Sequence, residues 1–431
     1  MSSTHHLIAS SSPEITSLLD RASQEEIAPY LAFYAGLGAQ TPSIFPLGND
    51  HAYYIQSKSH FYFDDQSIQS KESNPLLSTS PQDVFYDLAS LTKPMVTALW
   101  FWTLESTQQL KRTDPLKRWI NLESSLLQEC PLWHLVNHSS GLPAHFKYYE
   151  GLGTNRLKGM NPSELKKRIR SMLSHTRPIY VPGEKSLYSD LGYLLLEWIC
   201  EKASGESISS FWTRTCLNIN QFFGSPHAFL AHFNSLAPLP FSPPFDPPPP
   251  SIPSSLTFES SRYIPTEHCP WRGQLLRGEV HDDNTWLMGG VAGHAGLFGR
   301  LTDVVLWAVS FLKAFHGRDN PFQLSAKYLR DVCDYKWRNT PNGSFVLGWD
   351  TPSLGYSSAG SKLGPWAIGH LGFTGTSLWM DVEQEIILVL LTNRVCPNRT
   401  GGQGIRWLRP SLHDAAWAEF TKNDPHLKSR T

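Results

Sequence analysis

The middle of the chain carries apolar side chains at helical spacing. Residues 94–109 follow this pattern, as do residues 163–173 and 191–202. Ser163 is placed where an N-cap residue would begin the second of these helices. A further helix is expected over 406–422, near the end of the sequence. The periodicity therefore predicts a helical middle with another helix after it.

Toward both ends the pattern changes to short apolar runs bounded by Gly, Asn and Asp. Such runs are typical of strands, and we predict strands over 345–350, 367–372, 377–382 and 386–393, with a turn at 381–385 between the last two. The N-terminal third predicts one helix over 13–24 and strand-like runs over 27–35 and 52–63. The two ends of the chain would then build one antiparallel sheet.

This order of elements predicts an α/β (α+β) fold in two parts. Residues 1–104 and 256–431 would form a discontinuous sheet domain flanked by helices, and residues 105–255 a mainly helical domain, with the active site in the cleft between them. Residues 237–255 contain four consecutive prolines, which neither a helix nor a central strand accommodates. We expect an extended surface loop there, and a proline-rich ligand for a partner module stays open as an alternative.

Composition narrows the class of protein. Hydrophobic residues make up 40% of the chain and charged residues 17%, which excludes general disorder. The formal net charge of −1 predicts neither nucleic acid nor an anionic membrane surface as a partner. The densest apolar run, 386–391, is far too short to span a bilayer.

The N-terminus and the cysteines give weaker indications about location. The first residues lack a basic stretch followed by an apolar one, which favours a cytoplasmic location, although a trimmed periplasmic protein would look the same. The six cysteines form no C-x-x-C pair, so we expect buried free thiols, with an occasional disulfide left open.

Candidate chemistry begins in the stretch YDLASLTKPMV, residues 86–96. Ser90 and Lys93 are three positions apart, so on a helix they share a face and the amine can reach the hydroxyl. A serine becomes nucleophilic when a base removes its proton, and a desolvated lysine can lose its charge and act as that base. The N–H groups at the start of the helix could stabilise an oxyanion.

The S-x-x-K spacing alone is weak evidence, because it occurs twice more. Ser163 with Lys166 looks like a helix cap beside a solvated lysine, and Ser310 with Lys313 lies in a mostly buried helix. Only Ser90 has suitable companions later in the chain.

Two downstream stretches supply these companions. Tyr188, in the sequence YSD, could relay a proton between nucleophile, lysine and leaving group. In GHLGFTG, residues 369–375, Gly372 would let a substrate backbone approach closely, and the Phe373 N–H could be a second oxyanion donor beside that of Ser90. His370 could hydrogen-bond to substrate or to the tyrosine.

In this order and at these separations, the three motifs resemble those of the serine β-lactamase and penicillin-binding-protein superfamily. The chain is similar to its class C-like and esterase-like branch, which includes D-Ala-D-Ala carboxypeptidases, esterases and transesterases. Further similar stretches are LVNHSSGLP at 135–143 and LLRGEVHDDNTWLMGGVAGHAGLFG at 275–299. The resemblance covers roughly residues 80–420 and implies a β-lactamase/transpeptidase-like fold without a cofactor.

The resemblance also implies roles for individual residues. Ser90 matches the acylated nucleophile, Lys93 the lysine that shares its proton, and Tyr188 the tyrosine of the Y-x-N element. Asp190 stands where lactamases have Asn, and His370 stands where they have Lys. Both residues should line the pocket and tune the tyrosine. A titratable imidazole and an added negative charge would weaken the binding of a substrate carboxylate.

The sequence therefore predicts a serine hydrolase that forms an acyl-enzyme at Ser90 with a small-molecule or peptide ester or amide, and it leaves the oligomeric state open. Two alternatives within the superfamily remain: a class C-like β-lactamase, and a sensor that is acylated without turnover. A third alternative is a zinc site built from the sequence HDD at 281–283 and from His294. No H-E-x-x-H motif supports this metal site.

Overall fold

The computed structural model describes residues 12–38, 84–225, 229–233, 262–338, 340–341, 343–423 and 426–427. The strand predicted over 52–63 and the proline-rich stretch 237–255 lie outside these described residues.

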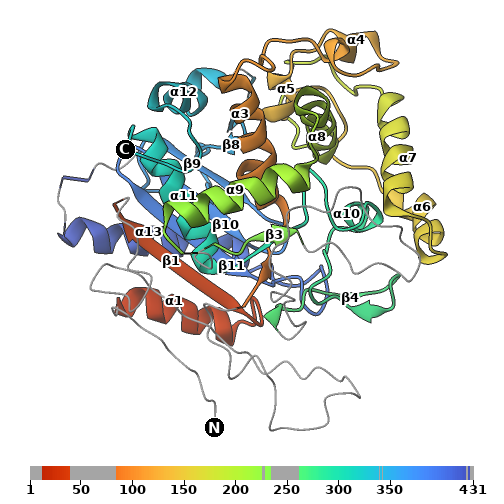
Figure 1. Ribbon diagram of the computed structural model, residues 1–431. Helices are drawn as coiled ribbons and strands as arrows, with labels where there is room; N and C mark the ends of the chain where they lie inside the picture. The colour runs from red at the N-terminus through yellow and green to blue at the C-terminus, as the bar shows by residue number, and fades with distance from the viewer. Residues whose placement is uncertain are drawn as a thin grey trace.

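Both ends of the chain contribute to a six-stranded sheet with the order β1-β11-β10-β9-β8-β7 (Figure 1). All neighbouring strands are antiparallel. This confirms the predicted antiparallel sheet and the turn between β10 and β11. The strands are β1 (Leu31–Leu37), β7 (Phe345–Val346), β8 (Trp349–Asp350), β9 (Ala367–Leu371), β10 (Ser377–Asp381) and β11 (Ile386–Thr392).

The position of strand β11 within the sheet explains why its sequence is apolar without interruption. Every one of its residues is buried, because both faces of the sheet are covered. Ile387, Val389 and Leu391 belong to one core cluster. Ile386, Leu388 and Leu390 belong to a second. The alternation of side chains along a strand thus divides β11 between two cores.

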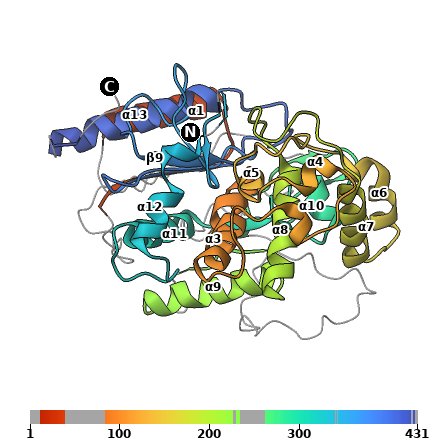
Figure 2. The ribbon, with the colours of Figure 1, turned by 90° about the horizontal axis from the view of Figure 1, so that it is seen from above.

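Helices α1 (Pro13–Gln24) and α13 (Ile405–Asn423) pack against each other and lie on one face of the sheet, whereas α11 (Leu301–Phe315) lies on the opposite face (Figure 2). The bounds of α1 confirm the helix predicted over 13–24. Its first turn is capped by the Ser12 side chain, and Pro13 occupies the first helical position, where no N–H is needed.

Most of the remaining helices gather beside the sheet (Figures 1 and 2). These remaining helices are α3 (Leu99–Ser106), α4 (Ser125–Gln128), α5 (Trp133–Val136), α6 (Tyr148–Leu157), α7 (Pro162–Ser174), α8 (Asp190–Ser204), α9 (Ile208–Phe222), α10 (Asp283–Leu287) and α12 (Ala326–Val332). Five short strands stand outside the large sheet: β2 (Tyr86–Asp87), β3 (His232–Phe233) and β6 (Leu297–Gly299) pair in one small sheet, and β4 (His268–Cys269) and β5 (Gln274–Leu275) in another.

Two local predictions were wrong. Helix α7 is capped by Asn161, whose side chain accepts the Ser163 N–H, because Pro162 takes the first helical position. The strand predicted over 345–350 is a hairpin, in which Phe345 pairs with Asp350, because Gly348 has a φ of 107° and turns the chain back.

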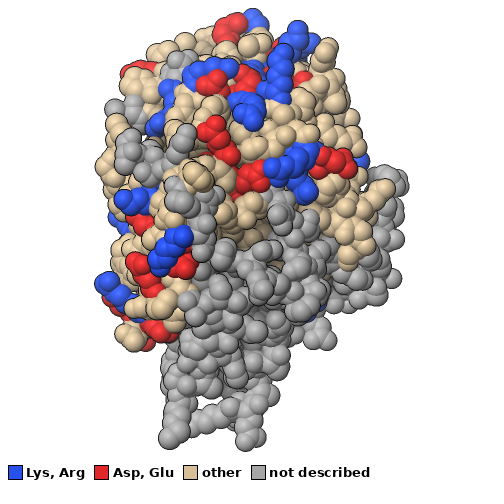
Figure 3. Space-filling view, turned by 90° about the vertical axis from the view of Figure 1, so that its left-hand side faces the viewer, with Lys and Arg blue, Asp and Glu red and all other residues tan. Residues whose placement is uncertain are grey.

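The distribution of charged residues on the surface and the state of the cysteines agree with what the composition predicts. Lys and Arg side chains lie interspersed with Asp and Glu on the face in Figure 3. All six cysteines are free, and five of them are buried, which confirms the expected thiols. Within the described ranges, no helix is both long and apolar enough to cross a membrane.

Candidate active site

The backbone presents Ser90 on a tight turn that follows β2. Ser90 lies in the 3-10 helix η2 (Ala89–Leu91), and a π-helical segment, η3 (Lys93–Ala98), continues into α3. Ala89 has a φ of 48°, a left-handed conformation that costs energy for a residue other than glycine. The Asp87 carboxylate compensates by accepting the Ala89 N–H at 2.8 Å. The residue directly before the candidate nucleophile therefore has a strained backbone conformation.

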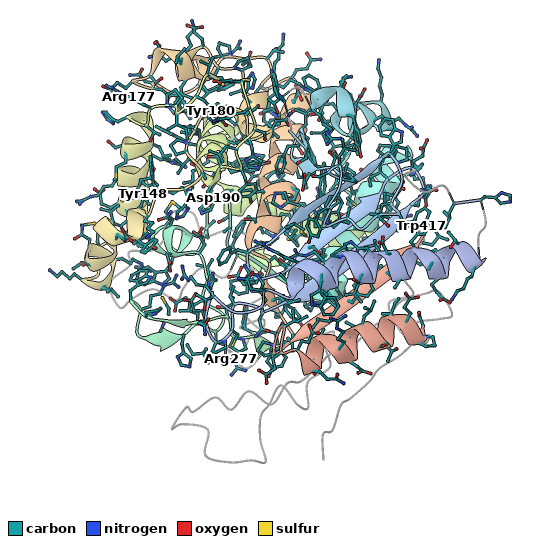
Figure 4. All side chains as sticks on the ribbon, turned by 180° about the vertical axis from the view of Figure 1, so that it is seen from behind. Tyr148, Arg177, Tyr180, Asp190, Arg277 and Trp417 are labelled. Carbon is teal, nitrogen blue, oxygen red and sulfur yellow. The ribbon has the colours of Figure 1, made fainter. Side chains whose placement is uncertain are left out.

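Lys93 meets Ser90 as the sequence predicts. Its Nζ donates to Ser90 Oγ at 2.9 Å, to Asp190 Oδ1 at 2.7 Å and to the His294 carbonyl at 3.0 Å. The lysine side chain is fully buried. Figure 4 shows Asp190 toward the middle of the molecule, between the helices and the sheet. One ammonium group therefore joins three segments that are far apart in sequence.

Two opposing effects act on the charge of Lys93. Burial disfavours the ammonium form, but the Asp190 carboxylate outweighs this effect, so the pKa of Lys93 is raised above its ordinary value. Burial alone would raise the pKa of Asp190, yet Lys93 holds it well below its usual range. Asp190 thus favours the ammonium form of Lys93 before a substrate binds.

Tyr188 lies over this ion pair. The Lys93 Nζ is 4.8 Å from the centre of the Tyr188 ring, and the buried Tyr188 hydroxyl interacts with Lys93 and Ser90. Burial raises the pKa of Tyr188, and the Lys93 charge acts in the opposite direction. The phenol is held by the rings of His138, at 4.4 Å, and His370, at 5.8 Å. Its hydroxyl therefore lies beside both the candidate nucleophile and the lysine.

His370, on β9, is neutral and oriented. Its Nδ1–H donates to the Leu371 carbonyl at 2.9 Å, which leaves the buried Nε2 without a partner among the described residues. Burial lowers the pKa of His370 to about 3, and the nearby Lys93 charge adds to this shift. The imidazole is therefore uncharged at neutral pH and presents only a hydrogen-bond acceptor.

Gly372 lies against the turn that carries Ser90. A side chain there would begin 2.8 Å from the Leu88 carbonyl and 2.0 Å from Thr376 Oγ1. The turn that carries Ser90 thus approaches Gly372 closely, and the approach of a substrate there stays a prediction. No described group accepts a hydrogen bond from the next N–H, that of Phe373, which leaves this donor available. The Phe373 ring stacks on His281.

These residues face one cavity of about 590 Å³. Its lining consists of Ala89, Ser90, His145, Lys147, Tyr149, Tyr188, Asp190, His281, Asp282, Asp283, His294, Ala295, Phe345, Asp350, His370, Leu371, Gly372, Phe373 and Arg399. The structure thus brings together all the candidate residues, with Lys93 buried beneath the lining.

Sequence reasoning missed two residues of this site. His145 Nδ1 lies 3.2 Å from Asp190 Oδ2. Asp87 accepts the His281 N–H at 2.7 Å and so ties the Ser90 turn to the segment before α10. Only its position directly before the turn that carries Ser90 could have indicated Asp87. No local sequence pattern singles out His145.

The two other S-x-x-K pairs have structural roles, and Lys166 is mostly buried in ion pairs, not solvated as predicted. Ser163 Oγ donates to Asn161 at the start of α7, whereas Lys166 forms ion pairs with Glu197 and Glu201. In the pair within α11, Ser310 Oγ donates to the Leu306 carbonyl. Neither serine approaches its lysine.

The residues considered for zinc bind other protein groups. His281 Nε2 is hydrogen-bonded to Glu267, and His294 Nε2 is 3.0 Å from Asp282 Oδ1. In the part of the chain that the structure describes, no group of three or more His, Cys, Asp or Glu is arranged to hold a metal ion.

Comparison with known proteins agrees with this geometry. The profile of the Beta-lactamase family matches residues 71–409. A Salmonella agona protein named "Putative D-alanyl-D-alanine carboxypeptidase" is 27% identical over 338 residues, which are 75% of this chain and 72% of that protein.

Solved structures share the fold. An octameric penicillin-binding protein homologue from Pyrococcus abyssi matches 95% of this chain and 77% of its own, with a TM-score of 0.60 and 17% identity. A hydrolase with promiscuous acyltransferase activity matches 94% of this chain and 98% of its own, with a TM-score of 0.60 and 16% identity. The chain belongs to the Beta-lactamase family and is a serine hydrolase with the β-lactamase/transpeptidase fold.

Proposed function

We propose that Ser90 is the acylated nucleophile and that the enzyme transfers acyl groups from esters or amides to water or to an acceptor alcohol or amine. The observation that carries this proposal is the hydrogen bond of 2.9 Å between Lys93 Nζ and Ser90 Oγ, at the floor of a cavity. Lys93 and Tyr188 move the proton, first from Ser90 and then to the leaving group. The N–H groups of Ser90 and Phe373 hold the oxyanion.

The state of His370 favours an acyl group without a carboxylate beside the reacting bond. A neutral imidazole that offers only an acceptor atom cannot form an ion pair with such a carboxylate. Asp190, which is ion-paired to Lys93, adds negative charge on the same side. Simple esters and uncharged amides therefore fit the cavity better than β-lactams.

A peptide ending in D-alanyl-D-alanine is the second candidate substrate. The name of the Salmonella agona relative points to it. Arg399 and Lys147, which line the same cavity, would supply cations for a terminal carboxylate. Each already pairs with carboxylates of the protein, Arg399 with Glu267 and Asp283 and Lys147 with Glu150.

A substrate panel tests both candidates. We would compare p-nitrophenyl acetate and butyrate, a D-alanyl-D-alanine peptide and nitrocefin, with wild type, Ser90→Ala and Ser163→Ala. Ser163 is a matched control because it belongs to another S-x-x-K pair and its side chain is exposed. We expect ester turnover that Ser90→Ala abolishes and Ser163→Ala retains.

Three other results would change the proposal. Residual ester turnover in Ser90→Ala above a few per cent would reject the nucleophile. Faster turnover of the peptide or of nitrocefin would reject the assigned preference. A stable adduct on Ser90 in mass spectrometry, without product release, would show an acylated sensor.

A cytoplasmic location stays a prediction, which cell fractionation would test.

A further inference from the structure

The Phe373 N–H, which the proposed function assigns to the oxyanion, lies in a tight turn between β9 and β10. The Gly372 N–H donates to the Thr376 carbonyl at 2.8 Å, which closes this turn. Inside it, the Gly375 N–H donates to the Gly372 carbonyl at 3.0 Å. Gly375 has a φ of 95°, which allows the chain to reverse there. The backbone around Phe373 is therefore fixed without the use of the Phe373 N–H itself.

Two threonine hydroxyls join this turn to the turn that carries Ser90. Thr374 Oγ1 donates to the Asp87 carbonyl at 2.8 Å. Thr376 Oγ1 donates to the Leu88 carbonyl at 3.2 Å. Both threonines are fully buried. The two turns that supply N–H groups for the oxyanion are therefore hydrogen-bonded directly to each other.

A third hydroxyl, that of Thr392 at the end of β11, binds the turn from the neighbouring part of the sheet. Its Oγ1 donates to the Thr374 carbonyl at 2.8 Å, and the Arg394 N–H donates to the same carbonyl at 3.0 Å. Thr392 is buried, so water does not compete for this hydroxyl. A side chain at Gly375 would collide with Thr392 Oγ1. Glycine at this position therefore leaves the room that the contact needs.

These hydrogen bonds form a connected series that ends at the Phe373 N–H. In a trans peptide the C=O and the N–H point in opposite directions, so a donor on the carbonyl makes the N–H of the same peptide group a stronger donor. The Thr392 hydroxyl acts on the peptide group that joins Thr374 to Gly375. The N–H of that group acts on the Gly372 carbonyl, which shares a peptide group with the Phe373 N–H. Polarisation that begins at Thr392 thus reaches the oxyanion donor.

We propose that Thr392 is a positioning residue whose hydroxyl, through two successive peptide groups, orients and polarises the Phe373 N–H. The inference rests on the acyl-transfer function proposed above. Thr392 does not line the cavity and so acts only through the turn. Negative charge develops on the substrate oxygen as Ser90 attacks, so a stronger donor stabilises the transition state more than the bound substrate. Thr392 should therefore affect kcat more than KM.

The size of the effect follows from the strength of an oxyanion donor. Loss of one such donor lowers kcat by a factor of about 10²–10³, whereas cooperativity changes a hydrogen bond by about 10–30%. Removal of the Thr392 hydroxyl would weaken the donor without deleting it, and would leave the Thr374 carbonyl with the Arg394 N–H alone. The resulting loss in kcat should be roughly threefold to tenfold.

Three variants separate this role from a purely structural one. We would measure kcat and KM for p-nitrophenyl acetate with wild type, Thr392→Val, Thr392→Ser and Thr215→Val. Valine keeps the shape of threonine but loses the hydroxyl, whereas serine keeps the hydroxyl and loses the methyl group. Thr215 is a matched control, because its buried hydroxyl also donates to a backbone carbonyl, that of Phe211 in α9, away from the cavity.

Thr392→Val should lower kcat roughly threefold to tenfold while KM changes less than about twofold. Thr392→Ser and Thr215→Val should both follow wild type. An unchanged kcat in Thr392→Val, or a loss in Thr392→Ser as large as that in Thr392→Val, would overturn the proposal. A loss of kcat in Thr392→Ser would also overturn it if urea unfolding showed that Thr392→Val does not fold.

A second measurement probes the tetrahedral state directly. When the boron of phenylboronic acid bonds to a serine Oγ, the serine proton leaves to solvent and the adduct becomes a tetrahedral anion that resembles the intermediate. Its affinity should fall in Thr392→Val by about the same factor as kcat, and should be retained in Thr392→Ser. Equal affinity in Thr392→Val and wild type would refute the role of Thr392.

The variant Ser90→Ala distinguishes the two proposals in the same assay. Full ester turnover in Ser90→Ala would reject the acyl-transfer function at Ser90, together with the role of Thr392 that rests on it. Loss of turnover in Ser90→Ala, with Thr392→Val equal to wild type, would reject only the role of Thr392.

Discussion

Removing Asp190 should expose the energetic cost of burying Lys93. The lysine side chain is fully buried, and Asp190 Oδ1, at 2.7 Å, carries its counter-charge. In Asp190→Ala the uncompensated ammonium would be expensive, so Lys93 should become neutral instead. Neutralising a lysine costs about 1.4 kcal/mol for each pH unit below its ordinary pKa of about 10.4. At pH 7 the variant should therefore lose about 4–5 kcal/mol of unfolding free energy.

The sign of the pH dependence follows from proton binding. In the folded variant Lys93 is neutral, whereas in the unfolded chain it remains protonated until about pH 10. The unfolded state binds more protons, so the stability of the variant rises with pH, and its deficit should fall to about 2 kcal/mol at pH 9. In wild type, the raised pKa of Lys93 and the lowered pKa of Asp190 keep both groups charged over this range.

Urea unfolding of both proteins at pH 7, 8 and 9 would measure this difference. Asp331→Ala is a matched control, because it removes a carboxylate 2.7 Å from Arg112, a guanidinium that does not lose its proton. Its cost should not change with pH. A cost for Asp190→Ala that is constant with pH, or below about 1 kcal/mol at pH 7, would refute the reasoning and imply that water solvates Lys93.

Two further substitutions test the support of the site. Gly372→Ala should lower kcat for p-nitrophenyl esters and cost about 1–3 kcal/mol of stability, because the new methyl would press on the Leu88 carbonyl. Gly151→Ala, at a glycine of α6 with open space around it, should leave kcat unchanged and raise stability by up to about 1 kcal/mol, because alanine favours a helix. Glu197→Ala should cost about 3 kcal/mol in urea unfolding, because the carboxylate is buried, pairs with Lys166 and accepts the Gly293 N–H. Unchanged stability of Glu197→Ala would show that this network contributes nothing to the fold.

The sequence predicted the sheet well because the relevant pattern is local. Three of the four short apolar runs near the C-terminal end are single strands, and the fully apolar run 386–393 is β11, which is covered on both faces. The hairpin at 345–350 was missed because its turn depends on the backbone of Gly348, which periodicity does not report. The division of the chain into a sheet domain and a domain over 105–255 stays a prediction.

The site was predicted in its composition but not in its charge. Ser90 and Lys93 are three residues apart, so helical geometry alone brings them together. Asp190 is 97 residues from Lys93, and His145 is 45 residues from Asp190. Contacts over such separations depend on how the helices pack, and they decide whether the lysine is charged. A motif thus identified the participants, whereas their protonation required the three-dimensional structure.

The pairing of β1 with β11 has a consequence for the synthesis of the protein. Leu31 pairs with Thr392 and Leu37 with Ile386. Almost the whole chain must therefore be synthesised before the edge strand β1 can pair with β11. The N-terminus is synthesised first. The apolar segment LAFYAGL therefore leaves the ribosome before the strand whose backbone pairs with it. Contacts of such long sequence separation form slowly. Newly made chains should depend on chaperones that cover this segment until β11 emerges.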